Sequence, residues 1–357
     1  MALCTILSPP VPLDIEAELK AARRQLMRTC QHPGAAKGVC DKLIDAHTVP
    51  RAALARFAVD GHVIQLNLTD PTAELRGDAA TITAAPRGIN EASTLPIFCG
   101  KHDKAVFAPI EDGDITATAD IALLFHYRAA VRQRVNSEYA RRGYTRVWET
   151  IEALPEPTRT AFRDELAFEV QDSLRISARD ESYKAVCDNL LEAKSTDGVR
   201  AVFVEFNHLP HFMCCGMFDP IFDFAGRSLQ QLAHPLARIA ATIDPVALTV
   251  IGTERGGLAV LSSVGFGLAA GHFLASFAAL PDSDKADAIT RLTYSVVENV
   301  YFAPSWWNAM DTDSQAKFIA EANARYGARL PDDVLAPATP HLADWEVAYV
   351  RCIGLET

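Results

Sequence analysis

One short turn at the end of the first third of the chain limits how this sequence can fold. In "IFCGKHD", Cys99 and His102 are separated by two residues and follow an apolar run. This spacing lets a tight turn direct a thiolate and an imidazole at one tetrahedral metal ion. Two ligands are too few for a stable site, so the remaining ligands must come from elsewhere in the chain.

The missing ligands are found upstream, at Cys30 and Cys40. The loop between them contains Pro33, Gly34 and Gly38, so it can fold back and bring the two thiolates together. The sequence therefore predicts a structural zinc site whose ligands are Cys30, Cys40, Cys99 and His102. His32 is an alternative to Cys30. A second interpretation treats the cysteines as small buried apolar residues and His102 as a surface histidine.

Composition indicates an ordinary globular chain. With 357 residues, of which 49% are hydrophobic and 22% charged, it suits one large or two medium domains. The net charge of -11 argues against a broadly basic surface, although a local basic face remains compatible with phosphate binding. Eight irregularly spaced cysteines indicate reduced thiols, and the N-terminal residues lack the pattern of a secretory signal. We expect a cytoplasmic protein.

One uncharged stretch, Leu258 to Leu280, is long enough to cross a bilayer. Its glycines and serines and the β-branched run before it favour another structure. We expect a buried hairpin over Val246–Ile251 and Leu258–Val264, followed by a helix from about Leu268. No membrane segment is predicted.

The remaining pattern predicts an α+β fold with three regions. Residues 1–115 form a small zinc-binding module, 116–195 form connecting helices, and 196–357 form a larger α+β domain. Within the module we expect a helix at 15–29, then a Pro/Gly loop, a strand, a helix and another strand, and a loop from Thr69 to Arg87. Further helices are expected over Ala286–Val300 and Ser314–Tyr326.

The segment "AHTVPRAALARF" lies between the two halves of the predicted zinc site. A cysteine pair, a strand with a histidine, a helix and a second knuckle follow one another, and this order resembles the HNH, or ββα-metal, nuclease module of treble-clef type. The resemblance covers about Cys30 to Glu111. It implies that His47 is the general base, that Asp103 binds a catalytic Mg or Mn ion, and that Asn90 is the middle polar residue, with Ser93 and Thr94 as rivals.

The sequence departs from the HNH pattern at one important position. HNH modules usually carry a metal-binding residue immediately before the base, and here that residue is Ala46, with Asp45 one position further back. A module that keeps the zinc but lacks the second metal would be a non-catalytic scaffold. The stretches "AHTVP", "ASTLPIFCGKHD" and "VENVYFAPSWW" also resemble an uncharacterised bacterial family, which implies no activity.

The most basic stretch follows the module, with six arginines from Arg128 to Arg146 against the single acid Glu138. We expect Arg128, Arg132 and Arg134 to contact the phosphates of DNA or RNA. The alternative is ion pairing with the many acids that follow. The resulting hypothesis is a nuclease with a C-terminal targeting or sensing domain. The competing hypothesis is a zinc-scaffold adaptor whose C-terminal domain binds a protein partner.

Overall fold

The structure is a computed structural model, and it describes residues 29–68, 82–111, 114–153, 156, 158–229, 244–325, 335–338, 341–343 and 345–355. Within these ranges, eight strands form one antiparallel sheet in the order β10-β5-β8-β7-β6-β9-β2-β3. Its strands are β2 (His62–Leu68), β3 (Ile82–Gly88), β5 (Val199–Phe206), β6 (Phe212–Phe218), β7 (Val246–Thr253), β8 (Gly256–Val264), β9 (Val300–Phe302) and β10 (Val347–Ile353). The mixture of helix and antiparallel sheet agrees with the predicted α+β class.

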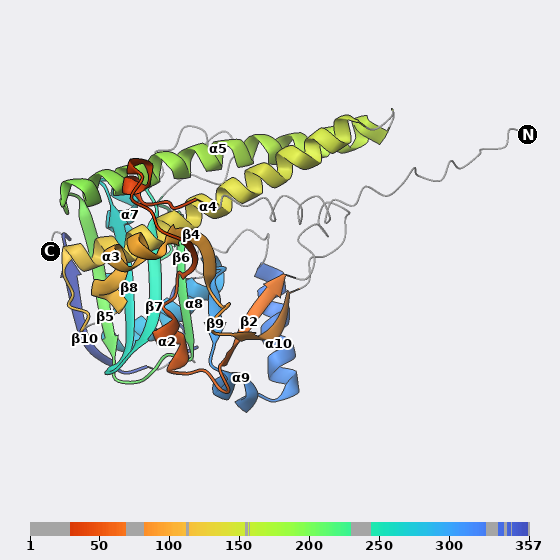
Figure 1. Cartoon of the computed structure of the whole chain (residues 1–357). Coiled ribbons are helices and arrows are strands. Elements are labelled where there is room, and N and C mark those ends of the chain that lie inside the picture. The colour runs from red at the N-terminus through yellow and green to blue at the C-terminus, as the bar shows by residue number, and fades with distance from the viewer. Residues whose placement is uncertain are drawn as a thin grey trace, which may run out of the picture.

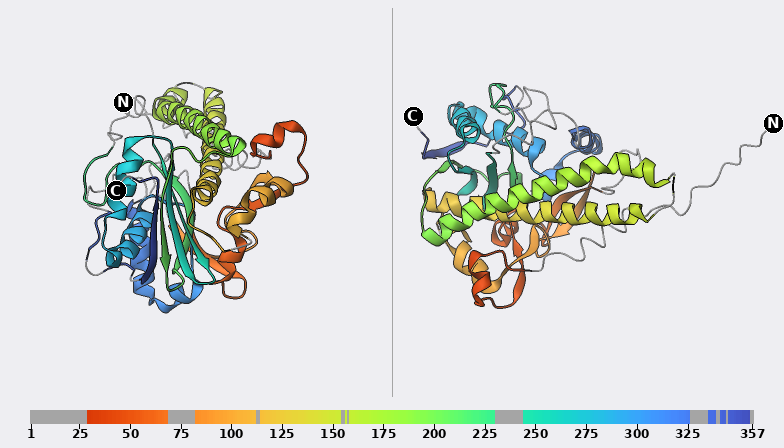
Figure 2. Two further views of the ribbon diagram at one scale, coloured as in Figure 1. Left: turned by 90° about the vertical axis from the view of Figure 1, so that its left-hand side faces the viewer. Right: turned by 90° about the horizontal axis from the view of Figure 1, so that it is seen from above.

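Helices cover both faces of this sheet (Figures 1 and 2). One face is crossed by α4 (Ala119–Glu152), on which α5 (Thr158–Ala193) packs, and the opposite face by α7 (Leu268–Ala278) and α8 (Asp282–Val296). Two apolar cores result, and alternate strand residues enter them: Phe203 belongs to one and Val204 to the other. Because both faces are buried at the centre of the sheet, β7 and β8 are nearly continuous apolar runs.

The predicted hairpin is confirmed. β7 and β8 pair directly, with Glu254 and Arg255 as the connecting residues, and α7 begins at Leu268 as expected. Cys214 and Cys215 on β6 enter opposite cores, as the alternation of a strand requires. No described helix has the length and apolar character needed to cross a membrane.

A smaller unit lies beside the face covered by α4. β1 (Leu43–His47) pairs antiparallel with β4 (Thr94–Cys99), and β4 leads directly into α3 (Gly100–Glu111), which contacts α4. The 3₁₀ helix η1 (Pro33–Lys37) precedes β1, while α2 (Arg51–Ala55), β2 and β3 are inserted between β1 and β4. The predicted order of loop, strand, helix and strand is therefore present.

The large sheet crosses the boundary predicted at residue 115. β2 and β3 come from the predicted module, yet β2 pairs with β9 of the C-terminal region. The loop predicted from Thr69 to Arg87 is wrong for 82–87, because β3 pairs along its length with β2 at the sheet edge. Residues 69–81 and nearly all of the helix predicted at 15–29 lie outside the described residues.

The last helices follow the predicted pattern with shifted ends. α8 ends at Val296, four residues before the predicted end at Val300, and Val300 instead begins β9. α9 (Pro304–Ala309) and α10 (Thr312–Arg325) follow, so the second predicted helix is α10. The far end of the α4–α5 hairpin extends beyond the sheet (Figure 1).

Candidate metal centre

The four predicted zinc ligands come from two loops that meet at the start of α3. Cys30 and Cys40 flank η1, whose ends are fixed by the Gly34 N–H donating to His32 Nδ1 at 2.9 Å and by Gly38 at φ 69°. Cys99 is the last residue of β4 and His102 lies in the first turn of α3. Local backbone geometry therefore presents all four side chains to one point.

Two further hydrogen bonds hold the loops together. The carboxylate of Asp41 accepts from the backbone N–H of Lys101 at 3.0 Å, and the N–H of Gly100 donates to the carbonyl of Lys42 at 3.0 Å. A carboxylate at the N-terminus of α3 satisfies a backbone donor that the helix itself cannot. The segment just after Cys40 is thereby tied to the turn between Cys99 and His102.

The distances in this Cys/His group fit a tetrahedral metal ion. The Nδ1 atom of His102 lies 3.5 Å from the sulfur of Cys30, 3.5 Å from that of Cys40 and 3.2 Å from that of Cys99. All four ligand atoms lie within 4.8 Å of one another. A tetrahedral zinc ion holds sulfur and nitrogen ligands about 3.5 Å apart, so these residues could hold such an ion.

The alternative ligand His32 is engaged elsewhere. Its Nδ1 atom caps η1, and its ring stacks on the ring of His102 at a centroid distance of 4.1 Å. Cys99 is buried and Cys40 is exposed. Loss of hydration, followed by hydrogen bonds with the Cys99 and Cys30 thiols, raises the pKa of Cys40 to about 11. Metal binding at this group must displace thiol protons and is therefore pH-dependent.

His47, the predicted general base, ends β1 opposite Thr94 of β4. Its Nε2 atom lies 2.9 Å from the carbonyl oxygen of Ile89, which assigns the ring proton to Nε2 and leaves Nδ1 as an acceptor. Partial burial lowers the pKa of His47 below its usual value. The neutral form of the ring is therefore favoured, and Nδ1 is the nitrogen that can accept a proton.

A group of charges surrounds Asp103, the predicted ligand of the catalytic metal. Burial raises the pKa of Asp103 to about 6, with Arg128 opposing and Glu111 adding to this effect. Arg128 is 2% exposed, donates to Glu111 at 2.5 Å and lies over the ring of Phe107 at 4.1 Å. Both Arg128 and Glu111 also act electrostatically on His47, so the four side chains share one region between β1, α3 and α4.

Glu111 was missed by the sequence reasoning, which treated its surroundings as the end of the module. Asp103, Phe107 and Glu111 are spaced four residues apart on α3 and therefore share one helix face, a signal that the sequence does contain. No comparable spacing in the sequence indicates that Arg128 is buried against Phe107.

The basic helix does not present a row of free arginines. Arg128 is buried against α3, and Arg134 forms an ion pair with Glu181 of α5. Arg141 and Arg142 both pair with Glu138. Arg132 is partly buried. The packing of α4 against α3 removes Arg128 from the surface, and its packing against α5 engages Arg134 within the chain.

The remaining HNH-related positions form no hydrogen bond or ion pair with Asp103, Glu111 or Arg128 within the described residues. The side-chain oxygen of Asn90 accepts a hydrogen bond from Arg51 at 2.6 Å, and both side chains are exposed. Ala46 is 2% exposed and belongs to the core, whereas Asp45 faces solvent. The rival Ser93 is buried, and Thr94 donates to the carbonyl of Glu91 at 2.9 Å.

Ser93 belongs to a buried polar network that joins three distant segments. The N–H of Ser93 donates to the Tyr301 hydroxyl at 2.6 Å, and its hydroxyl lies 2.6 Å from that of Thr48. Asn299 donates to the Thr48 hydroxyl at 3.0 Å and to the carbonyl of Cys215 at 3.1 Å. Thr48, Ser93, Asn299 and Tyr301 lie in the stretches "AHTVP", "ASTLPIFCGKHD" and "VENVYFAPSWW", so hydrogen bonds connect these three stretches with one another and with β6.

No family model matches the chain, and no curated protein and no solved structure is significantly similar to it. The HNH resemblance therefore depends on the order of motifs in this sequence.

Proposed function

We propose that Cys30, Cys40, Cys99 and His102 hold one structural zinc ion. The donor set and the sulfur–nitrogen distances support this, and four protein ligands leave no open position for a substrate. Such an ion would stabilise the contact between the η1 loop and the start of α3. Zinc is accordingly assigned a structural role, and the chemistry is assigned to the side chains around His47.

We further propose that the module hydrolyses phosphodiester bonds of nucleic acid, with His47 as general base. The observation that carries this proposal is the hydrogen bond between His47 Nε2 and the carbonyl of Ile89, which orients the ring. Within the described residues Nδ1 forms no hydrogen bond, so it can accept a proton from water. β1, β4 and α3 supply the two strands and the helix of a ββα unit beside the Cys/His group.

Asp103 is the proposed ligand of a second, divalent ion. Glu111 is neutralised by Arg128, whereas no hydrogen bond or ion pair engages Asp103 within the described part of the chain. Magnesium commonly binds through one or two carboxylates together with water and substrate phosphates. When bound, such an ion would stabilise negative charge on the phosphate. Asp103 would hold the ion, and His47 would take the proton from water.

A non-catalytic scaffold is the second candidate, and one observation favours it. Ala46 occupies the position where HNH modules carry a metal ligand, and its methyl side chain, which is buried in the core, has no atom that could bind a metal. In this case zinc would support a surface that binds a protein partner.

Cleavage of single- and double-stranded DNA and RNA in magnesium or manganese distinguishes the two candidates. We expect His47→Ala to reduce cleavage by at least about a hundredfold without changing zinc content or melting temperature. His62→Ala, which changes an exposed histidine on β2, is the matched control and should retain activity. Wild-type protein that cleaves none of these substrates would favour the scaffold role, whereas a His47→Ala variant that cleaves equally well would overturn the role of His47 as general base.

A further inference from the structure

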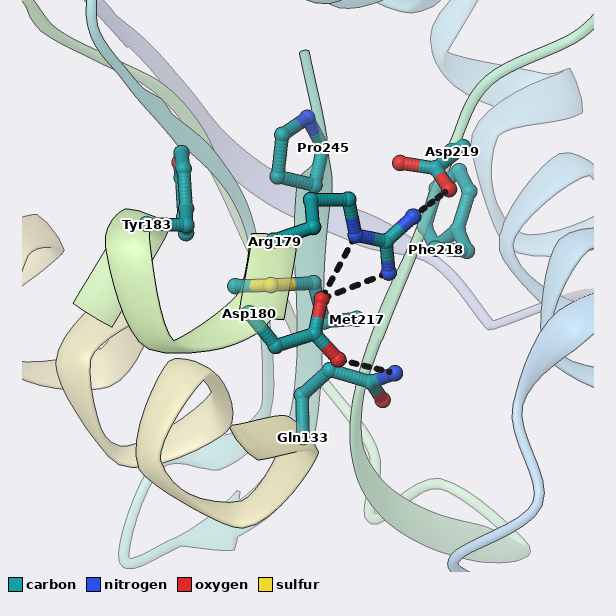
Figure 3. Close-up of a pocket in the computed structure, with 8 residues that line it drawn as sticks. All are labelled: Gln133, Arg179, Asp180, Tyr183, Met217, Phe218, Asp219 and Pro245. Carbon is teal, nitrogen blue, oxygen red and sulfur yellow. Dashed lines mark hydrogen bonds and ion pairs between the residues drawn. The ribbon is translucent and has the colours of Figure 1, made fainter. Parts of the chain in front are cut away.

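Many arginines of this protein are neutralised by carboxylates. In Figure 3 the guanidinium of Arg179 donates through Nε to Asp180 at 2.7 Å and through Nη1 to Asp219 at 2.8 Å. Arg128 and Arg134 of α4 likewise form ion pairs with glutamates. These arginines join neighbouring elements, and their positive charge is balanced within the chain.

Arg51, the first residue of α2, is held by a neutral side chain instead. Its Nε atom donates to the Oδ1 atom of Asn90 at 2.6 Å, and both side chains are exposed. Glu91, the acid that follows Asn90, pairs with Arg87 at 3.2 Å. Arg51 forms no ion pair with any residue that the structure describes. An amide orients a guanidinium without cancelling its charge, so Arg51 presents an oriented positive charge to solvent.

This charge lies beside His47, the proposed general base. The Nε2 atom of His47 lies 2.9 Å from the carbonyl oxygen of Ile89, and the next residue, Asn90, holds Arg51. Consecutive Cα atoms are about 3.8 Å apart, so two adjacent positions of one turn hold both side chains. Burial is the main cause of the lowered pKa of His47, and the positive charges of Arg128 and Arg51 lower it further. The guanidinium of Arg51 therefore acts on the same region as the imidazole.

A guanidinium without a carboxylate partner suits a phosphate ligand. Its planar N–H groups match two phosphate oxygens and form charge-assisted hydrogen bonds with them. A nucleic-acid strand carries one negative charge per nucleotide, so a strand with one phosphate at His47 brings further phosphates close by. Because the net charge of the chain is -11, such a contact depends on local positive charge. Phosphate contacts fix the position of a strand and do not select its sequence.

We propose that Arg51 binds the backbone phosphate next to the phosphodiester on which His47 acts, and that Asn90 positions the guanidinium. This role rests on the proposed nuclease function of the module. Asn90, the middle polar residue of the HNH resemblance, thereby acts through Arg51 and does not touch the reacting atoms. Arg51 takes the place of Arg128 and Arg134, whose predicted phosphate contacts are prevented by their ion pairs within the chain.

Fluorescence anisotropy of labelled DNA and RNA oligonucleotides with the full chain, without added divalent ion, measures this contact separately from cleavage. We expect Arg51→Ala to weaken binding at low salt by at least about fivefold. The slope of log K against log salt should become shallower by about one, as for the loss of one phosphate contact. Arg351→Ala removes an exposed arginine from the edge strand β10 and should leave binding unchanged.

Asn90→Asp separates the positioning role from a merely structural one. The new carboxylate still accepts the hydrogen bond from Arg51 but neutralises its charge. We expect this variant to bind nucleic acid as weakly as Arg51→Ala while its melting temperature stays at or above that of wild type. A contact that only stabilised the fold would leave the affinity of Asn90→Asp unchanged.

Binding and cleavage together distinguish this inference from the nuclease activity. Binding that depends on Arg51, in a protein that cleaves no substrate, would support the phosphate contact and refute the nuclease activity alone. Cleavage by wild-type protein, with undiminished affinity in Arg51→Ala, would overturn the phosphate contact and leave the nuclease activity standing. Wild-type protein that binds neither DNA nor RNA at low salt would also overturn the contact. If Arg51→Ala fails to fold, the affinity of Asn90→Asp decides the question.

Discussion

Cys99 and Cys40 each contribute a sulfur atom to the Cys/His group, but Cys99 is buried and Cys40 is exposed. We predict that Cys99→Ser and Cys40→Ser each reduce bound zinc from about one ion per chain to near zero, since a hydroxyl is a poor zinc ligand. Loss of the ion should lower the free energy of unfolding by at least about 2 kcal/mol. Cys99→Ser should cost more, because it also buries a hydroxyl.

Elemental analysis and thermal melting of protein purified without chelator measure both effects. Cys352→Ser is the control, because Cys352 is exposed on β10 and takes no part in the group. Wild-type protein without zinc, or serine variants that retain it, would show that the four residues form no metal site.

His126 provides a second prediction at this scale. It is fully buried on α4, where it bonds to Ser262 of β8 and lies 2.8 Å from the Tyr183 hydroxyl. Burial lowers the pKa of His126 to about 4 from an unfolded value of 6.5. As the pH falls below 6.5, the unfolded chain binds a proton at His126 and the folded chain does not. The free energy of unfolding therefore decreases as the pH is lowered, and it levels off below about pH 4. The difference between the folded and unfolded pKa values corresponds to about 3 kcal/mol in the free energy of unfolding.

Urea unfolding of wild-type protein and His126→Gln between pH 7 and pH 4 isolates this contribution. The variant should be less stable at pH 7, because the histidine's packing is disturbed, but its stability should fall less steeply with decreasing pH. Carboxylates and the other histidines titrate in both proteins and cancel in the comparison. Parallel pH curves for the two proteins would show that His126 does not couple protonation to folding.

At the scale of elements, the sequence predicted those helices and strands whose own residues show apolar periodicity or turn motifs. The β7–β8 hairpin, α7 and α10 have apolar periodicity and turn residues within a few positions, and all three are present. β3 had no such signal, since its sequence, ITAAPRG, consists mostly of small residues and contains Pro86. A proline is tolerated on an edge strand, and β3 forms because β2 is available to pair with it.

The contacts of the candidate site also differ in whether a local sequence pattern predicts them. Cys99 and His102 are three positions apart, and their convergence follows from one turn. The pairing of Arg128 with Glu111 depends on how α4 packs against α3, which no spacing in the sequence specifies. A buried arginine was for this reason predicted as a surface contact, while its carboxylate partner was overlooked.

The polar network between Ser93 and Asn299 joins the turns that flank β1, β4 and β9. Asn299→Ala should lower the free energy of unfolding by about 3 kcal/mol, because it removes donors to Thr48 and Cys215 and leaves buried polar atoms unpaired. Asn299 also lies 3.3 Å from the Ser93 hydroxyl. The effects of Asn299→Ala and Ser93→Ala should therefore be non-additive by at least about 1 kcal/mol.

Chemical denaturation of the two single variants and the double variant measures this coupling. Asn308→Ala changes an exposed asparagine on α9 and should stay within about 0.5 kcal/mol of wild type. Additive effects of Asn299→Ala and Ser93→Ala would mean that the network is three separate contacts and does not connect the segments energetically.

At the scale of the whole molecule, the unit that carries the Cys/His group shares one apolar core with the large sheet. The core beneath α4 contains Ala46 and Leu54 from the predicted module together with Phe203 and Val260 from the C-terminal region. Hydrogen bonding continues from β9 to β2 across the same boundary. The boundary predicted at residue 115 coincides with a change of sequence motif, but one apolar core contains residues from both sides of it.

This shared core predicts that residues 29–115 and 116–355 do not fold as separate fragments. The first fragment would leave β2 without its partner β9, and the second would expose the apolar residues that Leu54 and Val63 cover in the full chain. Full-length protein should instead show one calorimetric transition, with circular dichroism and tryptophan fluorescence changing together, and a chelator should lower that whole transition. Two resolved transitions, of which only the first responds to the chelator, would contradict this prediction. So would a 116–355 fragment that melts cooperatively at the temperature of the full chain, because its sheet would then be complete without β2 and β3.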